Sequence, residues 1–270
     1  MNNYIRLSYL EIIFILIIYF FSGSIISYLF QNIGDSLHIN SYIFSPFSIL
    51  MNYLFIFLFY KFIVFSSKHE KFIINYSVQR FSLFPIALLL FIGQSIIAEF
   101  LTGLIPTEGK YFGNLYHSME NALLGNLTQY PIITFLNICI IAPICEEIFF
   151  RGLILKGLLN YKVQPTKAII ISAFIFGGAH IFPWQMLGGI MAGIVLGVVF
   201  YKTGSLLTST ILHIINNLTG YVMYIKYKHL NTPDFFLSYD TFILCFGIVL
   251  LILFGYLYSR LTKNYIWNPY

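Results

Sequence analysis

Charged residues are the scarcest class in this sequence. Asp, Glu, Lys and Arg together make up 9% of its 270 residues, whereas soluble domains carry roughly 25%. A chain with so little charge cannot cover the surface of a separate soluble domain. The formal net charge of +5 does not indicate a nucleic-acid partner either, because the basic residues punctuate apolar segments and form no basic patch.

Cysteine is also rare. The three cysteines, Cys139, Cys145 and Cys245, lie inside apolar runs without CxxC spacing, so we interpret them as small core residues and not as a disulfide or a zinc site. The first apolar run, Leu7–Leu29, lacks a small-residue cleavage site. We therefore expect this run to span a membrane instead of serving as a cleaved signal peptide.

Apolar residues, by contrast, make up 59% of the chain, and many runs reach the roughly 20 residues that a transmembrane helix needs. The sequence predicts an all-α, polytopic membrane protein with about eight transmembrane helices. The expected spans are Leu7–Leu29, Pro46–Phe65, Ser82–Leu101, Ile132–Leu155, Ala168–Phe182, Met186–Tyr201, Leu206–Tyr224 and Thr241–Ser259. The fifth and sixth are short and separated by a breaker at Pro183, so we expect a hairpin that stops below the outer face.

The basic residues predict the orientation of these spans. With both termini in the cytoplasm, 12 of the 15 Lys and Arg residues fall on the inner side. Only Lys110, Lys226 and Lys228 fall outside, as the positive-inside rule requires. The richness in Ile, Phe, Tyr, Asn and Lys is typical of an AT-rich bacterial genome. We expect a multi-pass protein of a bacterial plasma membrane, embedded in the lipid bilayer.

Two smaller predictions concern the polar parts of the chain. The long outer connection between residues 102 and 131 carries Leu115, Met119 and Leu123 at helical spacing, which predicts a short interfacial helix. Two amides within the spans, Asn52 and Gln94, are expected to form hydrogen bonds between helices.

Six polar side chains lie in the expected spans far from either interface: Glu146, Glu147, Arg151, His180, His213 and Asn217. Glu147 and Arg151 are four residues apart on one helix face, so we expect them to form an ion pair. His213 and Asn217 are also four apart and face one side of their helix. Glu146 is rotated away from Glu147 and has no such local partner.

The depths of these groups in the membrane are comparable. At about 1.5 Å per helical residue, Glu146 lies roughly 15 Å, His180 roughly 20 Å and His213 roughly 14 Å from the cytoplasmic ends of their helices. In a hydrocarbon core about 30 Å thick, the three can meet if the fourth, fifth and seventh spans surround one cavity. Gly177 and Gly178, just before His180, would let a helix or a substrate approach closely.

Two interpretations of this group are open. A buried polar network could lock the helices together, which is the better interpretation of the Glu147–Arg151 pair alone. Helix packing alone does not need a carboxylate, two imidazoles and an amide at the same depth. Such groups can activate water and stabilise an oxyanion. We therefore treat Glu146, His180 and His213, with Asn217, as candidate catalytic residues.

At these residues the sequence resembles the CPBP intramembrane proteases, which include type II CAAX prenyl endopeptidases and bacteriocin-processing or self-immunity (Abi) proteins. The family pattern of EExxxR, FxxxH and HxxxN is present as EEIFFR (Glu146–Arg151), FGGAH (Phe176–His180) and HIINN (His213–Asn217). The resemblance marks residues 131–221 as the catalytic core. It leaves a three-helix region with an outer loop over residues 1–130 and a loop with the last helix over 222–270.

The resemblance implies an eight-helix fold with a cavity open to the cytoplasm and membrane, and peptide-bond hydrolysis inside the bilayer. It implies that Glu146 is the general base and that His180 helps to hold the attacking water. His213 and Asn217 would stabilise the oxyanion. The second glutamate and the arginine of EEIFFR would have a supporting structural role.

The resemblance leaves the use of a metal open, since family members have been described both as metalloproteases and as glutamate-dependent proteases. Zinc could be held by Glu146, His180 and His213 with one position left for water. The HExxH pattern that places two histidines beside a base is absent. We therefore favour a mechanism without a cofactor and keep Zn²⁺ as the alternative.

Two other functions also stay open. The same fold could serve a non-enzymatic immunity or scaffold protein, and intramembrane carboxylates and histidines can form the proton relay of a transporter. The charged and Gly-rich features crowd into residues 143–220 without a counterpart in the first half, unlike the repeats of many transporters. We expect an intramembrane endopeptidase whose partner is a membrane-associated protein or peptide substrate.

Overall fold

The computed structural model describes residues 4–65, 71–77, 80–227, 240–265 and 267. Regular structure in these ranges is helical, apart from an isolated bridge between Tyr4 and Lys71. The prediction of an all-α protein is therefore confirmed. Lys68 and Lys228, which entered the count of basic residues, lie outside the described ranges.

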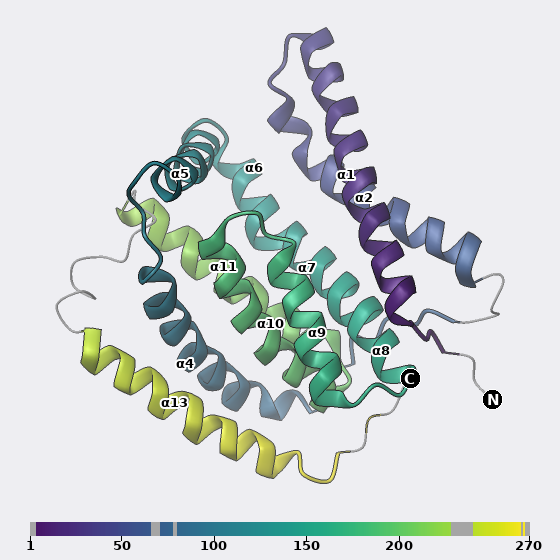
Figure 1. The fold of residues 1–270 in the computed structure, drawn as a ribbon, viewed down its shortest axis with the longest axis vertical. Coiled ribbons are helices and arrows are strands. Elements are labelled where there is room, and N and C mark those ends of the chain that lie inside the picture. The colour runs from purple at the N-terminus through teal and green to yellow at the C-terminus, as the bar shows by residue number, and fades with distance from the viewer. Residues whose placement is uncertain (1–3, 66–70, 78–79, 228–239, 266, 268–270) are drawn as a thin grey trace.

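Figure 1 shows the arrangement of the helices. The α-helices are α1 (Tyr9–Leu37), α2 (Ser45–Phe59), α4 (Phe84–Gly103), α5 (Phe112–Gln129), α6 (Pro131–Phe135), α7 (Ala142–Glu146), α8 (Lys156–Asn160), α9 (Pro165–Gly178), α10 (Pro183–Thr203), α11 (Leu206–Tyr227) and α13 (Asp240–Leu261). Two 3-10 helices are η1 (Ser41–Phe44) and η3 (Phe81–Leu83). Three π-helices are η2 (Tyr60–Phe65), η4 (Leu136–Ile141) and η5 (Glu147–Leu155).

Six helical stretches of the described chain are long and apolar enough to cross a membrane. They are Tyr9–Leu37, Ser41–Phe62, Phe81–Gly103, Pro131–Asn160, Pro183–Thr203 and Thr241–Leu261. The two remaining expected spans are α9, which has only 14 residues, and α11, whose 22 residues include the polar groups of the seventh span. The polytopic membrane architecture is confirmed. Helices α9 and α10 pack together as a hairpin, as predicted. The prediction that both arms are short is wrong for α10, which has 21 residues and is long enough to span a membrane.

The connections that we expect in the cytoplasm gather at one end of the helices. At the start of the chain, Leu7 N donates to Gly157 O at 3.1 Å, and Asn160 Nδ2 donates to Ile5 O at 2.9 Å. Near the other terminus, Trp267 Nε1 donates to Asn160 Oδ1 at 3.1 Å. The two described ends of the chain therefore lie on the same side (Figure 1), as an even number of spans requires. Which side is cytoplasmic stays a prediction.

The segment before α4 joins the same end. Asn75 Nδ2 donates to Gly204 O at 2.8 Å, and Leu206 N donates to Asn75 O at 2.8 Å. Close by, Arg80 Nη1 donates to Lys202 O at 3.1 Å. These bonds tie the loop before α4 to the turn between α10 and α11.

Helix α5 lies at the opposite end and is seen almost end-on in Figure 1, across the direction of the spans. Its buried Tyr116 packs edge-on against Trp184 of α10, with ring centroids 5.2 Å apart. Tyr224 of α11 donates to Glu120 O at 3.5 Å. Met119 is buried as well. The helix predicted in the outer connection is therefore present and packs over the ends of α10 and α11.

Helix α10 packs against α9, α4 and α11. Its contact with α9 depends on Gly177, where a Cβ would lie 2.6 Å from Met186 O and 2.7 Å from Ile190 N. At Gly178 nothing lies within 4 Å of that position. Of the two glycines expected to permit a close approach, Gly177 contacts a helix and Gly178 faces open space.

The two amides outside the site differ in their environments. Ser22 Oγ of α1 donates to Asn52 Oδ1 of α2 at 2.6 Å, which confirms the expected bond between helices. Gln94 is 3% exposed, and its side-chain oxygen has no hydrogen-bond partner among the described residues. The side-chain oxygen of Gln94 therefore does not form the expected hydrogen bond between helices.

The fourth span is one helical stretch interrupted by two π-helices. Pro143 accounts for the first, because its missing N–H and its ring prevent a regular α-helical bond to the preceding turn. That turn, η4, is π-helical and ends just before α7. The second, η5, begins at Glu147 and contains Arg151. Such segments are frequent at functional sites, and here they flank the helix that carries Glu146.

Candidate active site

The predicted ion pair between Glu147 and Arg151 is present and almost completely buried. Arg151 Nη1 donates to Glu147 Oε1, and the two side chains are 1% and 0% exposed. The guanidinium carbon lies 4.5 Å from the centre of the Phe176 ring of α9. Arg151 Nη2 also lies 3.5 Å from Gly193 O of α10. The pair therefore links the fourth span to both helices of the hairpin.

His213 of α11 lies between the two adjacent glutamates. Its Nδ1 is 3.0 Å from Glu147 Oε1, and its Nε2 is 3.6 Å from Glu146 Oε2. The carboxylate of Glu147, ionised beside Arg151, can only accept hydrogen bonds, so His213 Nδ1 carries the hydrogen. Glu147 thus fixes the ring with Nε2 facing Glu146.

Glu146 is the accessible member of the carboxylate pair. Its side chain is 19% exposed, whereas that of Glu147 is 0% exposed. As expected, the fourth span supplies no partner for Glu146. The partner comes from α11, because His213 Nε2 lies within ion-pairing distance but too far for a hydrogen bond.

His180 stands just beyond the end of α9. The ring of Phe176 lies between two imidazoles. Its centroid is 5.3 Å from that of His180 and 5.5 Å from that of His213, and both contacts are edge-to-face. His180 Nδ1 is 3.0 Å from Phe176 O. Because a carbonyl only accepts, Nδ1 carries the hydrogen, and Nε2 of the neutral ring is left as an acceptor.

The structure therefore brings His180 near the cluster but not into direct contact with it. Within the described ranges, no hydrogen bond or ion pair joins His180 to Glu146 or His213. The two imidazoles instead share contacts with one phenyl ring, Phe176.

Asn217 lies one turn beyond His213 on α11, and its amide is held in place. Asn217 Nδ2 donates to Ile138 O in η4 at 2.8 Å. Asn216 Nδ2 donates to Asn217 Oδ1 at 3.3 Å, and Ser95 Oγ of α4 lies 3.5 Å from Asn216 Oδ1. An amide nitrogen has two hydrogens, so one N–H of Asn217 remains for another acceptor.

The alternative zinc site requires Glu146, His180 and His213 to converge. Among the residues that the structure describes, no three His, Cys, Asp or Glu side chains are grouped closely enough to hold a metal ion. Both histidines use Nδ1 for a hydrogen bond, His213 to Glu147 and His180 to a backbone carbonyl, so Nε2 would be the ligating atom of each. The donors as arranged do not fit a three-ligand site, and we derive no step through a metal.

Several neighbours of the site were not predicted from the sequence. Ile138 acts through its backbone oxygen and has no side-chain signal. Asn216 and Ser95 support Asn217 from the next position and from α4. The only available hint was that Asn216 and Asn217 are adjacent in the HIINN motif.

The comparisons with known proteins point to the same part of the chain. Residues 128–219 match the family model described as type II CAAX prenyl endopeptidase Rce1-like. The chain carries an Rce1-like segment. This segment includes all six polar positions singled out above, so the resemblance seen in the motifs is confirmed over this third of the chain.

A curated relative covers a similar length. Over 96 residues, 35% of this chain and 52% of the relative, the sequence is 33% identical to UPF0177 protein YxdF of Lactococcus lactis subsp. lactis (strain IL1403). The match thus spans about half of that protein. No solved structure was found to match. Together with the apolar spans, the Rce1-like segment identifies a multi-pass membrane protein.

Proposed function

We propose that this protein is an intramembrane endopeptidase that hydrolyses a peptide bond of a membrane-associated protein or peptide. The main support is that the Rce1-like segment contains Glu146, His180, His213 and Asn217, and that Glu146 and His213 lie 3.6 Å apart. A network that only locked helices together would have no need of a partly exposed carboxylate facing a buried imidazole nitrogen.

Glu146 is the general base in this proposal. Its exposure lets water reach it, whereas Glu147 is buried and committed to Arg151 and His213. Glu146 removes a proton from water as the water oxygen attacks the carbonyl carbon. It then returns the proton to the leaving amine as the tetrahedral intermediate collapses.

His180 positions the attacking water. Its Nδ1–H is used by the carbonyl of Phe176, so the lone pair on Nε2 can accept a hydrogen bond from that water. This requires the neutral ring. The position just past the end of α9, beside Gly178 and open space, leaves room for the substrate chain on this side.

Asn217 and His213 stabilise the oxyanion. Asn217 offers the N–H that Ile138 does not use. His213 can donate through Nε2 only when both of its nitrogens carry a hydrogen, because Nδ1–H is already directed at Glu147. The oxyanion therefore meets one amide donor and one imidazolium donor.

The test compares membrane peptidomes from cells that carry the intact protein, Glu146→Gln or Glu99→Gln. Gln is nearly isosteric with Glu, so Glu146→Gln should insert and fold normally while cleavage falls by about 10²–10⁴-fold, the usual effect of losing a general base. Glu99 is exposed at the far end of α4 and serves as the matched control, with cleavage unchanged.

The outcomes separate the functions that the sequence leaves open. Products that persist in Glu146→Gln above roughly 1% of the normal amount exclude Glu146 as the base. Peptidomes identical with and without the whole protein exclude the protease. An immunity phenotype that survives Glu146→Gln would then favour the non-enzymatic function.

A further inference from the structure

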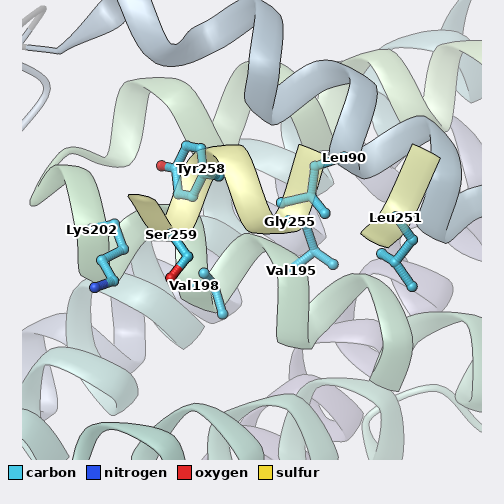
Figure 2. A pocket seen from close by; sticks show the side chains of 8 residues that line it. All are labelled: Leu90, Val195, Val198, Lys202, Leu251, Gly255, Tyr258 and Ser259. Atoms are coloured by element: carbon cyan, nitrogen blue, oxygen red, sulfur yellow. The ribbon is translucent and has the colours of Figure 1, made fainter. Parts of the chain in front are cut away.

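A cavity lies on the other side of α10 from the carboxylates Glu146 and Glu147. Here α4, α10 and α13 border a cavity of about 330 Å³, near the lower limit of typical ligand pockets. Its lining residues are Leu90, Val195, Val198, Lys202, Leu251, Gly255, Tyr258 and Ser259. Figure 2 shows these side chains. The candidate active site instead contacts α10 at Gly193 and Gly189, so the two sites are distinct.

The cavity is apolar along most of its length and polar at one end. Figure 2 shows Lys202, Tyr258 and Ser259 together at one end, with Leu90 and Leu251 farther along. On α10, Val195, Val198 and Lys202 recur at helical spacing, and Leu251, Gly255 and Ser259 do so on α13. The cavity therefore runs parallel to the helices for about 10 Å.

The polar end carries positive charge without a matching carboxylate. Arg80 Nη1 donates to the backbone oxygen of Lys202, which places a guanidinium beside the ammonium-bearing residue. Within the described ranges, neither side chain forms an ion pair with Asp or Glu. Both cations also lie over aromatic rings, Arg80 over Tyr265 at 4.2 Å and Lys202 over Tyr201 at 5.5 Å.

Tyr258 supplies an independent indication of a ligand. The residue is 1% exposed, and its hydroxyl has no hydrogen-bond partner among the described residues. A buried hydroxyl without a partner is unfavourable. Because Tyr258 lines the cavity next to the cationic end, an oxygen-bearing ligand there would accept its hydrogen bond.

We propose that this cavity binds one anionic phospholipid. The phosphate lies at Lys202 and Arg80, an ester or phosphate oxygen accepts from Tyr258, and one acyl chain runs along Val195 and Leu251. Clusters of Lys and Arg between transmembrane helices suit anionic headgroups. The cavity runs along helices that span the membrane, and this direction suits an acyl chain better than a soluble anion. This site does not depend on the proposed protease activity.

The test uses the full chain reconstituted in nanodiscs of phosphatidylcholine with a small fraction of phosphatidylglycerol. Native mass spectrometry then counts the lipids that stay bound after release. We expect one phosphatidylglycerol to be retained in preference to phosphatidylcholine. Lys202→Gln should weaken this binding about five-fold, the effect of one basic residue at a lipid surface. Lys61→Gln, which removes an exposed lysine from η2, is the matched control and should leave binding unchanged.

Two further variants examine the apolar part and the hydroxyl. Gly255→Leu should fill the cavity and abolish retention, since the nearest atom to a Cβ there is a leucine methyl at 3.7 Å. Tyr258→Phe should weaken lipid binding about two- to ten-fold, as expected for a lost hydrogen bond. If Gly255→Leu does not fold, Tyr258→Phe and Lys202→Gln still test whether the lipid binds in this cavity.

Three results would overturn the proposal. If phosphatidylcholine were retained as well as phosphatidylglycerol, the site would have no preference for an anionic lipid. Unchanged binding in both Lys202→Gln and Tyr258→Phe would place the lipid elsewhere. Protection of the detergent-solubilised protein against heat by inorganic phosphate, as strong as that by phosphatidylglycerol, would show that the site takes an anion without an acyl chain.

Discussion

Replacing Arg151 by Met tests how the buried ion pair holds the site together. Met keeps much of the side-chain volume and removes the charge. Glu147, which is 0% exposed, would lose its guanidinium partner and keep the bond from His213. Among the described residues, its Oε2 accepts no hydrogen bond in the intact protein. The substitution therefore leaves a buried carboxylate largely uncompensated.

The expected loss is large. Removing one partner of a buried pair costs about 3–5 kcal/mol, which is a substantial share of the roughly 5–15 kcal/mol that stabilises a typical protein. At about 2–4 °C per kcal/mol, the melting temperature should fall on the order of 10 °C. The loss of the guanidinium over Phe176 acts in the same direction.

The assay is thermal unfolding of the detergent-solubilised protein, with Arg260→Met as the control. Arg260 is an exposed residue in the last turn of α13, so its replacement should change stability by only about 0.3–1 kcal/mol. The double variant Glu147→Gln/Arg151→Met should lose less stability than the sum of the two single variants, because no buried charge is left alone. If Arg151→Met were as stable as Arg260→Met, the proposed role of the pair would be wrong.

Two further predictions follow from the helix contacts and from Asn217. Asn217→Ala should lower turnover by about 10²–10³-fold, and the chelator phenanthroline should leave the intact protein active. A mild effect of Asn217→Ala together with one equivalent of bound metal would support the zinc alternative. Gly177→Ala should lower the free energy of unfolding by about 1–3 kcal/mol, because the new Cβ meets the backbone of α10. Gly178→Ala is the control and should leave stability unchanged, because its Cβ meets nothing within 4 Å. Equal melting temperatures of the two variants would contradict the packing argument.

The positions of the helices could be predicted from the sequence because lipid leaves little choice of structure. In hydrocarbon, every backbone polar group must be satisfied within its own segment, so an apolar run predicts a helix. The seventh span was expected at Leu206–Tyr224 and extends to Tyr227. The first was expected to end at Leu29 and continues to Leu37. Helical hydrogen bonding does not require apolar side chains, so hydropathy did not mark that end; the helix stops where His38 adopts a positive φ of 56°.

The site could be predicted only in part. The Glu147–Arg151 pair follows from spacing within one helix. The bond between His213 and Glu147 joins residues 66 positions apart, and its formation depends on how α11 is rotated against η5. Sequence periodicity gives the polar face of each helix but not the facing partner. For the same reason, the use of Ile138 O by Asn217 was not predicted, since it depends on a π-helical turn.

The charges of the cluster lead to a last prediction, which concerns His213. With an imidazolium at His213, the ionised Glu146 and Glu147 are balanced by His213 and Arg151. In the proposed mechanism, Glu146 becomes neutral as the oxyanion forms, so the total charge stays at zero in a region of low dielectric constant. His213→Gln would leave one uncompensated negative charge at both stages and would also remove a donor to the oxyanion. Turnover measured on variants of verified fold should therefore fall further in His213→Gln than in Asn217→Ala, which removes a neutral donor and no charge. An equal or smaller loss in His213→Gln would contradict the imidazolium.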